Sequence, residues 1–589
     1  MDYSSRFVAT LIAALYYLGA APAMAQTTEP VALPTIEKTA PLPTTSAAQV
    51  QVQVQSLGQV EPFRVGALSG IPFKMPMQQW QGTRTGIAAQ LMSDLPEIGA
   101  SPLLNRLSAS VLISPSNPPT DGEGDMALAS LRLASVYRLG QLQAVINLAE
   151  RSPGGLSDPE NAAIATRAFL ALGQESNACE TAIRLQNGRG AIFWLKVRAF
   201  CLAREGRTAA AELTADLVLE TDPEDVDFLL ALNRMVHKDK TVIKPVNALE
   251  LAMARFSKAP IDLSEAPFSL KSAMVEAEGE VGLDAARMMA AAGLLNADTL
   301  AQIYLGWPGL PASEPVPAVQ DETQITQPAP APEDTQSPEE SDAALLAVAL
   351  AQTGAPRAAL LYQSALRAST PAGLAKAAYG GLKQEKELGA FLAAARLYAP
   401  LLQDISTQNL PLGQAMGRLF VYAALAAERP ELATTFINAA PARLQRFMTL
   451  SQKSITLTGL NFHTENLPQV KDANLAYTDL LTLWALGAPL NDQHRRFLFN
   501  QTIDNEEFSH CRAGAMAAIT DGARHKARAA SFLRAALMLA DTGFDRVAPQ
   551  CGANVIQALK TMGYEGLARQ AALEMMLGPR LQRVANLHE

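Results

Sequence analysis

Four cysteines are the residues whose type and spacing most directly imply chemistry in this chain of 589 residues. Cys179 and Cys201 lie close together in the sequence, and Cys511 and Cys551 form a second couple. In an exported chain an even number of cysteines favours disulfides over metal thiolates or a catalytic nucleophile. Four cysteines allow three pairings, of which the local one is the simplest. Two buried free thiols are the alternative for Cys179 and Cys201.

The N-terminal stretch decides the compartment in which these thiols lie. Residues 1–25 contain one Arg, an apolar run from Phe7 to Leu18 and small residues at the end. This order is typical of a secretory signal peptide cleaved after Ala25, and it predicts a periplasmic or secreted protein. An uncleaved signal anchor that tethers the chain to the inner membrane is the alternative. Because no later run is apolar enough, we expect no stable membrane span after cleavage.

Helices must position the first cysteine couple. Both flanking stretches, residues 160–186 and 191–205, show apolar residues at helical spacing, and the turn sequence NGRG separates them. Two neighbouring antiparallel helices bring Cys179 and Cys201 to the roughly 5.5–6 Å between Cα atoms that a disulfide requires. The sequence therefore predicts a stapled helical hairpin here.

The composition indicates an all-α fold. Hydrophobic residues make up 49% of the chain but aromatic residues only 6%, which fits closely packed small-residue helices. The one clear alternation, QVQVQVQS at residues 49–56, is interpreted as part of a linker rather than a strand. The net charge of −9 argues against a nucleic-acid partner, because phosphate binding needs clustered Lys and Arg.

Segments of different composition divide the chain into five parts. After the signal peptide, residues 26–84 are rich in Pro, Thr and Gln and are expected to be irregular. Residues 311–342 contain seven prolines, eight acidic residues and no Lys or Arg, which predicts an extended, disordered linker. Residues 85–310 and 343–589 read as two helical arrays on either side of it. Each array holds one cysteine couple.

Helix pairs within the arrays resemble the tetratricopeptide repeat. That family places an aromatic and small residues on a first helix, Gly in the turn, Ala on the second helix and Pro after it. Two stretches of this chain follow the pattern, with these residues: Leu133, Ala134, Tyr137, Gly140 and Ala144 in the first, and Trp194, Val197, Cys201, Gly206, Ala210 and Pro223 in the second. Cys201 replaces a usual aromatic and Pro223 comes one residue late. The resemblance implies an α-solenoid of antiparallel helix pairs in two arrays.

A second resemblance concerns the segment before the helices. The sequences LGQVEPFRVGAL at residues 57–68 and WQGT at residues 80–83 are similar to an uncharacterised group of exported bacterial helical-repeat proteins. This resemblance covers a short stretch and the general layout, and it implies no activity.

Catalytic and metal-binding motifs are largely missing. The sequence has no Gly-x-Ser-x-Gly elbow, no phosphate-binding Gly-x-x-x-x-Gly-Lys loop and no His-Glu-x-x-His. The best cluster is NEEFSHC, where Glu507 and His510 share a helix face beside Glu506 and Cys511. A transition-metal site needs three or four converging ligands, so a solvated helix start is the preferred interpretation. We expect no catalytic residue, no metal site and no cofactor.

Three functions fit these features. The first is a non-enzymatic scaffold or adaptor that binds another envelope protein or peptide on a concave face. The second is a cell-wall glycan-acting enzyme whose buried general acid is invisible in the sequence. The third is a polysaccharide-binding protein, for which grouped aromatic residues are expected and are not seen. The first is preferred.

Overall fold

The computed structural model describes residues 61–67, 70, 72–310, 337–436, 445–451, 455, 457, 470–500 and 508–583. Across these ranges the chain forms helices and isolated bridges, and no strand is present in them. The prediction of an all-α fold is confirmed. None of the helices in the same ranges combines the length and apolarity that a bilayer-spanning segment needs.

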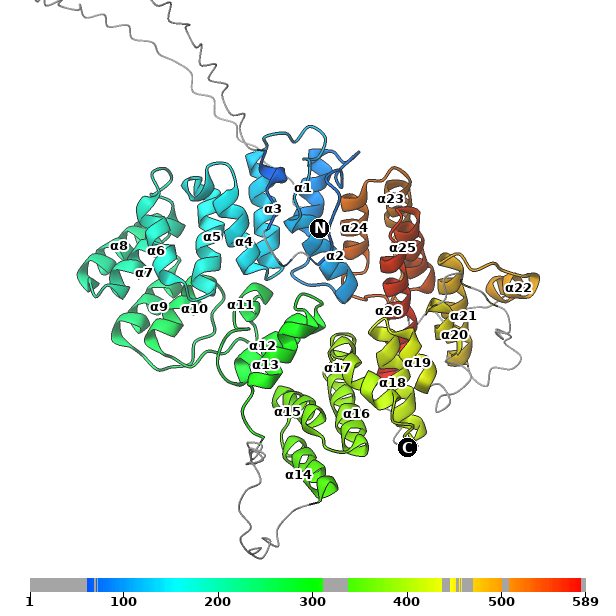
Figure 1. The fold of residues 1–589 in the computed structure, drawn as a ribbon. Helices are drawn as coiled ribbons and strands as arrows, with labels where there is room; N and C mark the ends of the chain where they lie inside the picture. The colour runs from blue at the N-terminus through cyan, green and yellow to red at the C-terminus, as the bar shows by residue number, and fades with distance from the viewer. Residues whose placement is uncertain are drawn as a thin grey trace, which may run out of the picture. The chain divides into compact units, whose positions relative to one another are not determined.

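The helices follow one another with short turns (Figure 1). Their bounds are α1 Thr85–Asp94, α2 Pro102–Ile113, α3 Met126–Arg138, α4 Leu142–Arg151, α5 Pro159–Ala171, α6 Glu175–Arg184, α7 Ile192–Arg204, α8 Thr208–Thr221, α9 Val226–His237, α10 Ala248–Ser257, α11 Phe268–Ser272, α12 Glu280–Ala291, α13 Ala297–Gly306, α14 Pro338–Leu350, α15 Gly354–Arg367, α16 Pro371–Glu387, α17 Phe391–Ser406, α18 Gln414–Ala426, α19 Pro430–Phe436, α20 Gln445–Met448, α21 Val470–Ala485, α22 Asp492–Asn500, α23 Ala513–Arg524, α24 Arg528–Met538, α25 Pro549–Thr561 and α26 Glu565–Arg583.

Neighbouring helices pack in adjacent pairs, as the repeat pattern predicts. Gly140 joins α3 to α4 with φ of 68°, and Gly206 joins α7 to α8 with φ of 76°. Both values lie in the left-handed region that side chains with a Cβ avoid. At Gly140 an added Cβ would also lie 2.6 Å from the Ser272 hydroxyl oxygen. Glycine is thus required there by both conformation and space.

The stretch before α1 belongs to the hydrophobic core. Phe63 and Trp80 are 0% and 1% exposed, and their ring centroids lie 6.4 Å apart. The buried guanidinium of Arg132 on α3 donates hydrogen bonds to the carbonyls of Val65 at 3.0 Å and Ser114 at 2.9 Å. The described residues between 61 and 84 therefore contribute buried side chains to the core without forming a long helix. The rest of the predicted irregular segment lies outside the described residues.

The predicted linker ends earlier than expected. Helix α14 begins at Pro338, inside the segment 311–342 that the sequence assigned to the linker. Ser337 and Glu340 form a reciprocal capping box at its N-terminus. The carboxylate of Asp342 is buried and accepts hydrogen bonds from the backbone N–H groups of Ser369 and Thr370, at 2.7 and 2.9 Å. Residues 311–336 lie outside the described residues.

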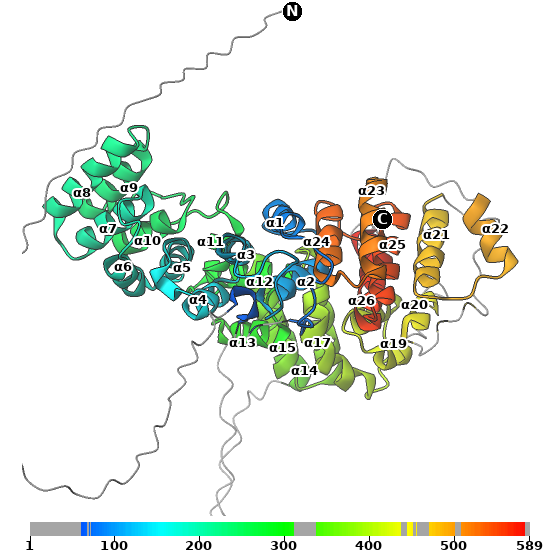
Figure 2. The same ribbon diagram turned by 90° about the horizontal axis from the view of Figure 1, so that it is seen from above.

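Long-range contacts close the helices into a ring. Helix α2 packs against α3 and α26, α3 against α11, α11 against α12, α12 against α17, α17 against α18, and α18 against α26. The first helices therefore lie beside the last ones, as both ribbon views show for α2 and α24 (Figures 1 and 2). Residues on the two sides of 311–336 belong to one compact unit, Gln59–Glu589.

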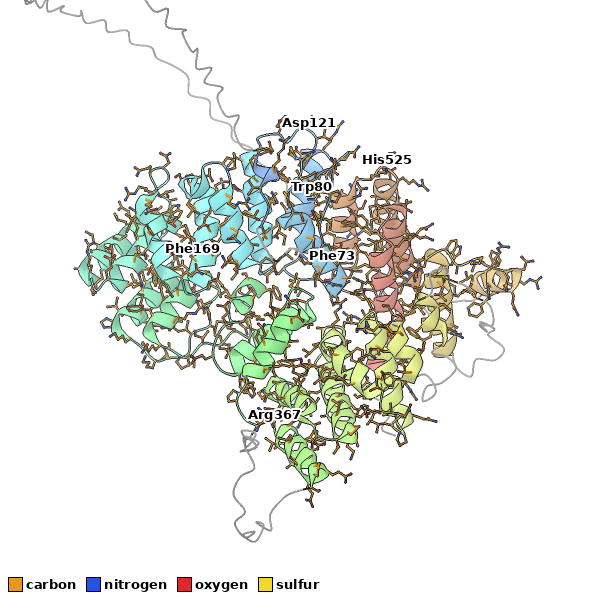
Figure 3. The ribbon with its side chains drawn as sticks, in the orientation of Figure 1. Phe73, Trp80, Asp121, Phe169, Arg367 and His525 are labelled. Atoms are coloured by element: carbon orange, nitrogen blue, oxygen red, sulfur yellow. A yellow bond between two sulfur atoms is a disulfide. The ribbon has the colours of Figure 1, made fainter. Side chains whose placement is uncertain are left out.

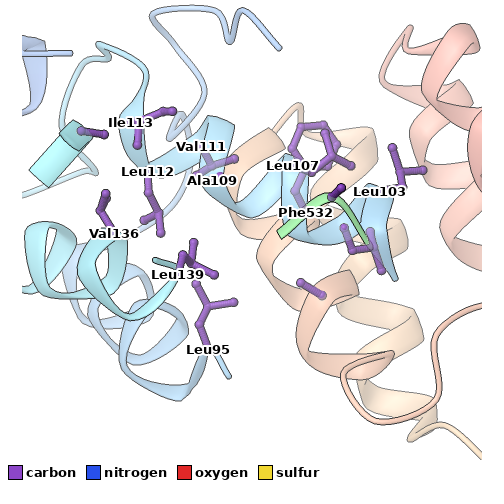
Figure 4. Packing of buried hydrophobic residues seen from close by; sticks show 14 of the residues in the cluster. Leu95, Leu103, Leu107, Ala109, Val111, Leu112, Ile113, Val136, Leu139 and Phe532 are labelled. Atoms are coloured by element: carbon purple, nitrogen blue, oxygen red, sulfur yellow. The ribbon is translucent and has the colours of Figure 1, made fainter. Parts of the chain in front are cut away.

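Apolar packing holds the junction between α2 and α24. Leu103 and Leu107 of α2 are fully buried, and Phe532 of α24 is 1% exposed. Figure 4 shows these side chains together between the two helices. Each such side chain contributes about 1.5–3 kcal/mol by its removal from water.

Candidate functional site

The structure pairs the four cysteines locally. Cys179 on α6 is bonded to Cys201 on α7, with 5.7 Å between their Cα atoms. Cys511 is bonded to Cys551 on α25, with 6.1 Å between their Cα atoms. Of the three possible pairings the chain has the one expected from the hairpin argument, and none of the four is a free thiol.

The metal-like cluster does not assemble in the part that is described. Ser509 forms an isolated bridge with Val547, and helix α23 begins only at Ala513. His510 and Cys511 therefore precede the helix, which corrects the expected helix start; Glu506 and Glu507 lie outside the described residues. Among the described residues no group of three His, Cys, Asp or Glu side chains is placed to hold a metal ion.

The basic run around His525 forms a turn between two helices. Helix α23 ends at Arg524 and α24 starts at Arg528, so the intervening residues do not share one helix face. His525 is exposed (Figure 3), and its Nδ1 lies 3.3 Å from a carboxylate oxygen of Asp521. Burial lowers the pKa of Arg534, which is half-buried on α24. These groups do not form a single anion-binding patch.

A cavity of about 470 Å³ lies between the α1–α2 loop, α12 and the end of α16. We call it the α12 cavity, because α12 supplies most of its wall. Its lining consists of Ile98, Gly99 and Ala100 from the α1–α2 loop, Asp284, Arg287, Met288, Ala291 and Ala292 from α12 and the following turn, and Leu388 after α16. Three segments that are distant in the sequence thus meet around one space.

Hydrogen bonds fix the loop wall of the α12 cavity. The Asn105 side chain accepts from the Gly99 N–H and donates to the Gly99 carbonyl, both at 2.8 Å. The same amide donates to the Ala292 carbonyl at 3.2 Å, which joins α2 to the end of α12. The Ala100 N–H donates to the Ala540 carbonyl at 2.7 Å. The wall is therefore preformed rather than a free loop.

Arg287 is the one cation in the lining, and a buried carboxylate holds it. Its Nε donates to Glu385 Oε2 on α16 at 3.2 Å, and the Tyr304 hydroxyl donates to Glu385 Oε1. The side chains of Arg287 and Glu385 are 9% and 1% exposed. Because an arginine has five N–H donors, four remain beyond the bond from Nε. No hydrogen bond from these four to a described residue is seen.

Tyrosines extend this polar network into the core. The Tyr362 ring contacts Tyr304 and Tyr398 edge-to-face, with centroid distances of 6.1 and 5.4 Å. Burial raises the pKa of Tyr304 and of Tyr398 well above the usual range, and the nearby Glu385 carboxylate acts in the same direction. Burial also raises the pKa of Glu385, although the Arg287 guanidinium opposes that shift.

A second carboxylate is engaged where α26 meets α2. Glu574 accepts hydrogen bonds from the Ser101 hydroxyl at 2.6 Å and from the Leu103 N–H at 2.9 Å. It therefore binds the first turn of α2, where backbone N–H groups lack helical partners. Loss of hydration raises the pKa of Glu574, despite these hydrogen bonds and the nearby Arg106 and Arg396.

No local sequence pattern predicts these carboxylates. Glu385 and Arg287 are 98 positions apart, and only the ring brings them together. Neither Glu385 nor Glu574 belongs to the cavity lining, whose one carboxylate is Asp284. The α12 cavity is thus chemically simple: apolar walls, one anchored guanidinium and one exposed carboxylate.

No family model, curated protein or solved structure matches the chain.

Proposed function

We propose that the chain is an exported, tetratricopeptide-like scaffold that binds a segment of another envelope protein, without catalysis. The observation that carries this proposal is the preformed α12 cavity with exposed apolar side chains at its walls. Ile98 is 36% exposed and Leu388 is 37% exposed, and both belong to the lining. Clustered exposed apolar groups in a fixed hollow are typical of a binding surface.

The polar groups of the cavity suit a peptide. The free N–H donors of Arg287 match a carboxylate, because a guanidinium binds a planar carboxylate through two parallel hydrogen bonds. Asp284, one helical turn away, accepts from backbone or ammonium N–H groups. Met288 and Ala291 offer the apolar surface that a peptide side chain covers. The C-terminal residue of a peptide carries all three kinds of group: a carboxylate, a backbone N–H and a side chain.

Glycan hydrolysis is a weaker proposal for the same cavity. Such an enzyme generally uses two carboxyl groups that face one bound sugar. Asp284 is the one carboxylate in the described lining, while Glu385 is held by Arg287 and Tyr304. The lining also contains no aromatic residue on which a sugar ring stacks.

Export is supported by two observations. The N-terminal 25 residues have the order of a signal peptide, and both cysteine pairs are placed to form disulfides. Disulfides persist in oxidising compartments such as the periplasm.

The proposal is tested by a photo-reactive amino acid at Met288, introduced into the full chain in cells. Irradiation should give a discrete protein adduct from this position. The same group at Lys376, exposed on α16 away from the lining, is the matched control and should give none. A glycan adduct, no adduct, or the same adducts at both positions would contradict the proposed scaffold function.

A further inference from the structure

A second cavity lies between α21 and α25. Its volume is about 440 Å³, and we call it the α21–α25 cavity. It is lined by Trp484, Ala485 and Gly487 at the C-terminal end of α21, and by Gln557, Lys560 and Thr561 on α25. None of these residues belongs to the α12 cavity.

Trp484 is unusual among the tryptophans of the chain. Trp80 and Trp194 are 1% and 3% exposed and Trp307 is partly buried, whereas Trp484 is 46% exposed. No ring or cation contact of its indole with a described residue is present. An indole left in water forgoes the stabilisation that burial of so large a side chain provides. Its position in the wall of a cavity indicates a ligand that covers it.

The facing wall is polar and partly anchored. Gln557, Lys560 and Thr561 lie within one turn of α25, so their side chains share a face. Lys560 Nζ donates to the Leu486 carbonyl at 2.6 Å, at the end of α21 where orphan carbonyls favour a cation. The other two N–H groups of this ammonium remain for a ligand.

Gly487 makes this anchoring possible. Its φ is 99°, a conformation that side chains with a Cβ rarely adopt. A Cβ at this position would lie 2.1 Å from Lys560 Nζ. Glycine therefore leaves room for the Lys560 ammonium to reach the end of α21, beside the cavity.

We propose that the α21–α25 cavity binds a hexopyranose ring of the gluco configuration. The flat C–H face of such a ring stacks on the Trp484 indole, and its equatorial hydroxyls meet Lys560, Gln557 and Thr561. The Lys560 ammonium donates, the Thr561 hydroxyl accepts, and the Gln557 amide does both.

A sugar fits these walls better than a peptide does. The lining has one aromatic face and three hydrogen-bonding side chains, and Ala485 is its one aliphatic side chain. An apolar peptide anchor needs a fully desolvated pocket, which this wall does not offer. The inference goes beyond the proposed scaffold function and uses another surface, so either can fail while the other holds.

Calorimetric titration of the full chain tests the inference, with cellotriose and N,N′,N″-triacetylchitotriose as probes. At least one trisaccharide should bind to the wild-type chain. Trp484→Ala should weaken that binding roughly tenfold, through loss of the stacking surface. Trp484→Phe keeps an aromatic face and should retain part of the affinity. Gln557→Ala should weaken binding about threefold, as expected for one hydrogen bond.

The matched control is Phe499→Ala. Phe499 on α22 is 90% exposed and is not part of the lining, so its loss should leave the affinity unchanged. Absence of binding by both trisaccharides would overturn the proposal, as would unaltered binding by Trp484→Ala. Equal losses in the Phe499 and Trp484 variants would also overturn it, since they would indicate non-specific aromatic contact. None of these outcomes bears on the crosslink at Met288.

Discussion

Two cavities of similar size in this chain have opposite chemistry. The α12 cavity has about 470 Å³ and no aromatic lining residue, whereas the α21–α25 cavity has about 440 Å³ and an exposed indole. Their origins differ as well. Three distant segments build the first, so it exists only while the ring is closed; two helices that pack on each other build the second.

Different contacts maintain the two cavities. The α12 cavity depends on buried polar contacts between distant segments, above all Arg287–Glu385 and the Asn105 amide. The α21–α25 cavity depends on the end of α21, on Gly487 and Lys560, and on the position of α25. Substitutions that damage one should therefore spare the other.

The largest effect is expected from Glu385→Leu. This change leaves the buried Arg287 guanidinium without its carboxylate, which typically costs about 3–5 kcal/mol of unfolding free energy. Chemical denaturation measures the loss, and crosslinking at Met288 should weaken in parallel. Glu387→Leu, an exposed position on the same helix, is the control and should change stability by less than about 0.5 kcal/mol. Equal losses of stability in Glu385→Leu and Glu387→Leu would contradict a stabilising role of the Arg287–Glu385 ion pair.

Removal of the disulfide near α25 should affect the α21–α25 cavity and leave the α12 cavity unchanged. Cys551 lies on α25, so replacement of Cys511 and Cys551 by Ser should destabilise the chain by about 2–4 kcal/mol and weaken binding at the α21–α25 cavity. Cys179 and Cys201 lie in the wall of neither cavity. Their replacement by Ser should therefore cost similar stability without changing either site. Denaturation and the trisaccharide titration report both quantities. Loss of trisaccharide binding in both variants would show that binding depends on the stability of the whole chain and not on the position of α25, which would contradict this prediction.

The raised pKa of Glu574, which joins α26 to α2, predicts that the stability of the folded chain depends on pH. Its pKa is raised in the folded chain, so the folded state is favoured below the ordinary carboxyl pKa, and that benefit is lost as pH rises through the folded value. Glu574→Gln keeps an amide that can bond Ser101 and Leu103 but does not titrate. The variant should therefore gain stability relative to wild type from pH 5 to pH 7. Denaturation midpoints at both values measure the trend, and a difference independent of pH would contradict it.

The smallest change in stability is expected from Leu388→Ser. The side chain is 37% exposed, so this substitution should change the unfolding free energy by less than about 0.5 kcal/mol. Because Leu388 lines the α12 cavity, the adduct formed from Met288 should nevertheless decrease. Trisaccharide binding should stay unchanged. A decrease of trisaccharide binding would link the two sites and contradict their independence.

Local patterns were sufficient to predict much of this fold. The glycines at 140 and 206 mark helix turns, and the helical spacing around Cys179 and Cys201 led to the hairpin in which they pair. The start of α14 was missed although Ser337 and Glu340 have capping-box spacing, because the prolines and acids around them dominated the interpretation.

The sites could not be predicted, because their members are distant in the sequence. Arg287 and Glu385 meet only through the closed ring, and no local pattern distinguishes Glu385 from the exposed Glu387. Trp484 and Lys560 are also distant in the sequence, so no local pattern predicts that they line one cavity. A lone tryptophan in a helical pattern normally predicts a core position. Exposure of the indole is a property of the packed structure.

Parallel photo-crosslinking at Met288 and at Thr561, which is exposed in the lining of the α21–α25 cavity, tests in intact cells whether the chain holds a peptide site and a separate sugar site. We expect a discrete protein adduct from Met288 and a glycan adduct, without that protein, from Thr561. The same protein adduct from both positions, or glycan at Met288, would contradict this expectation.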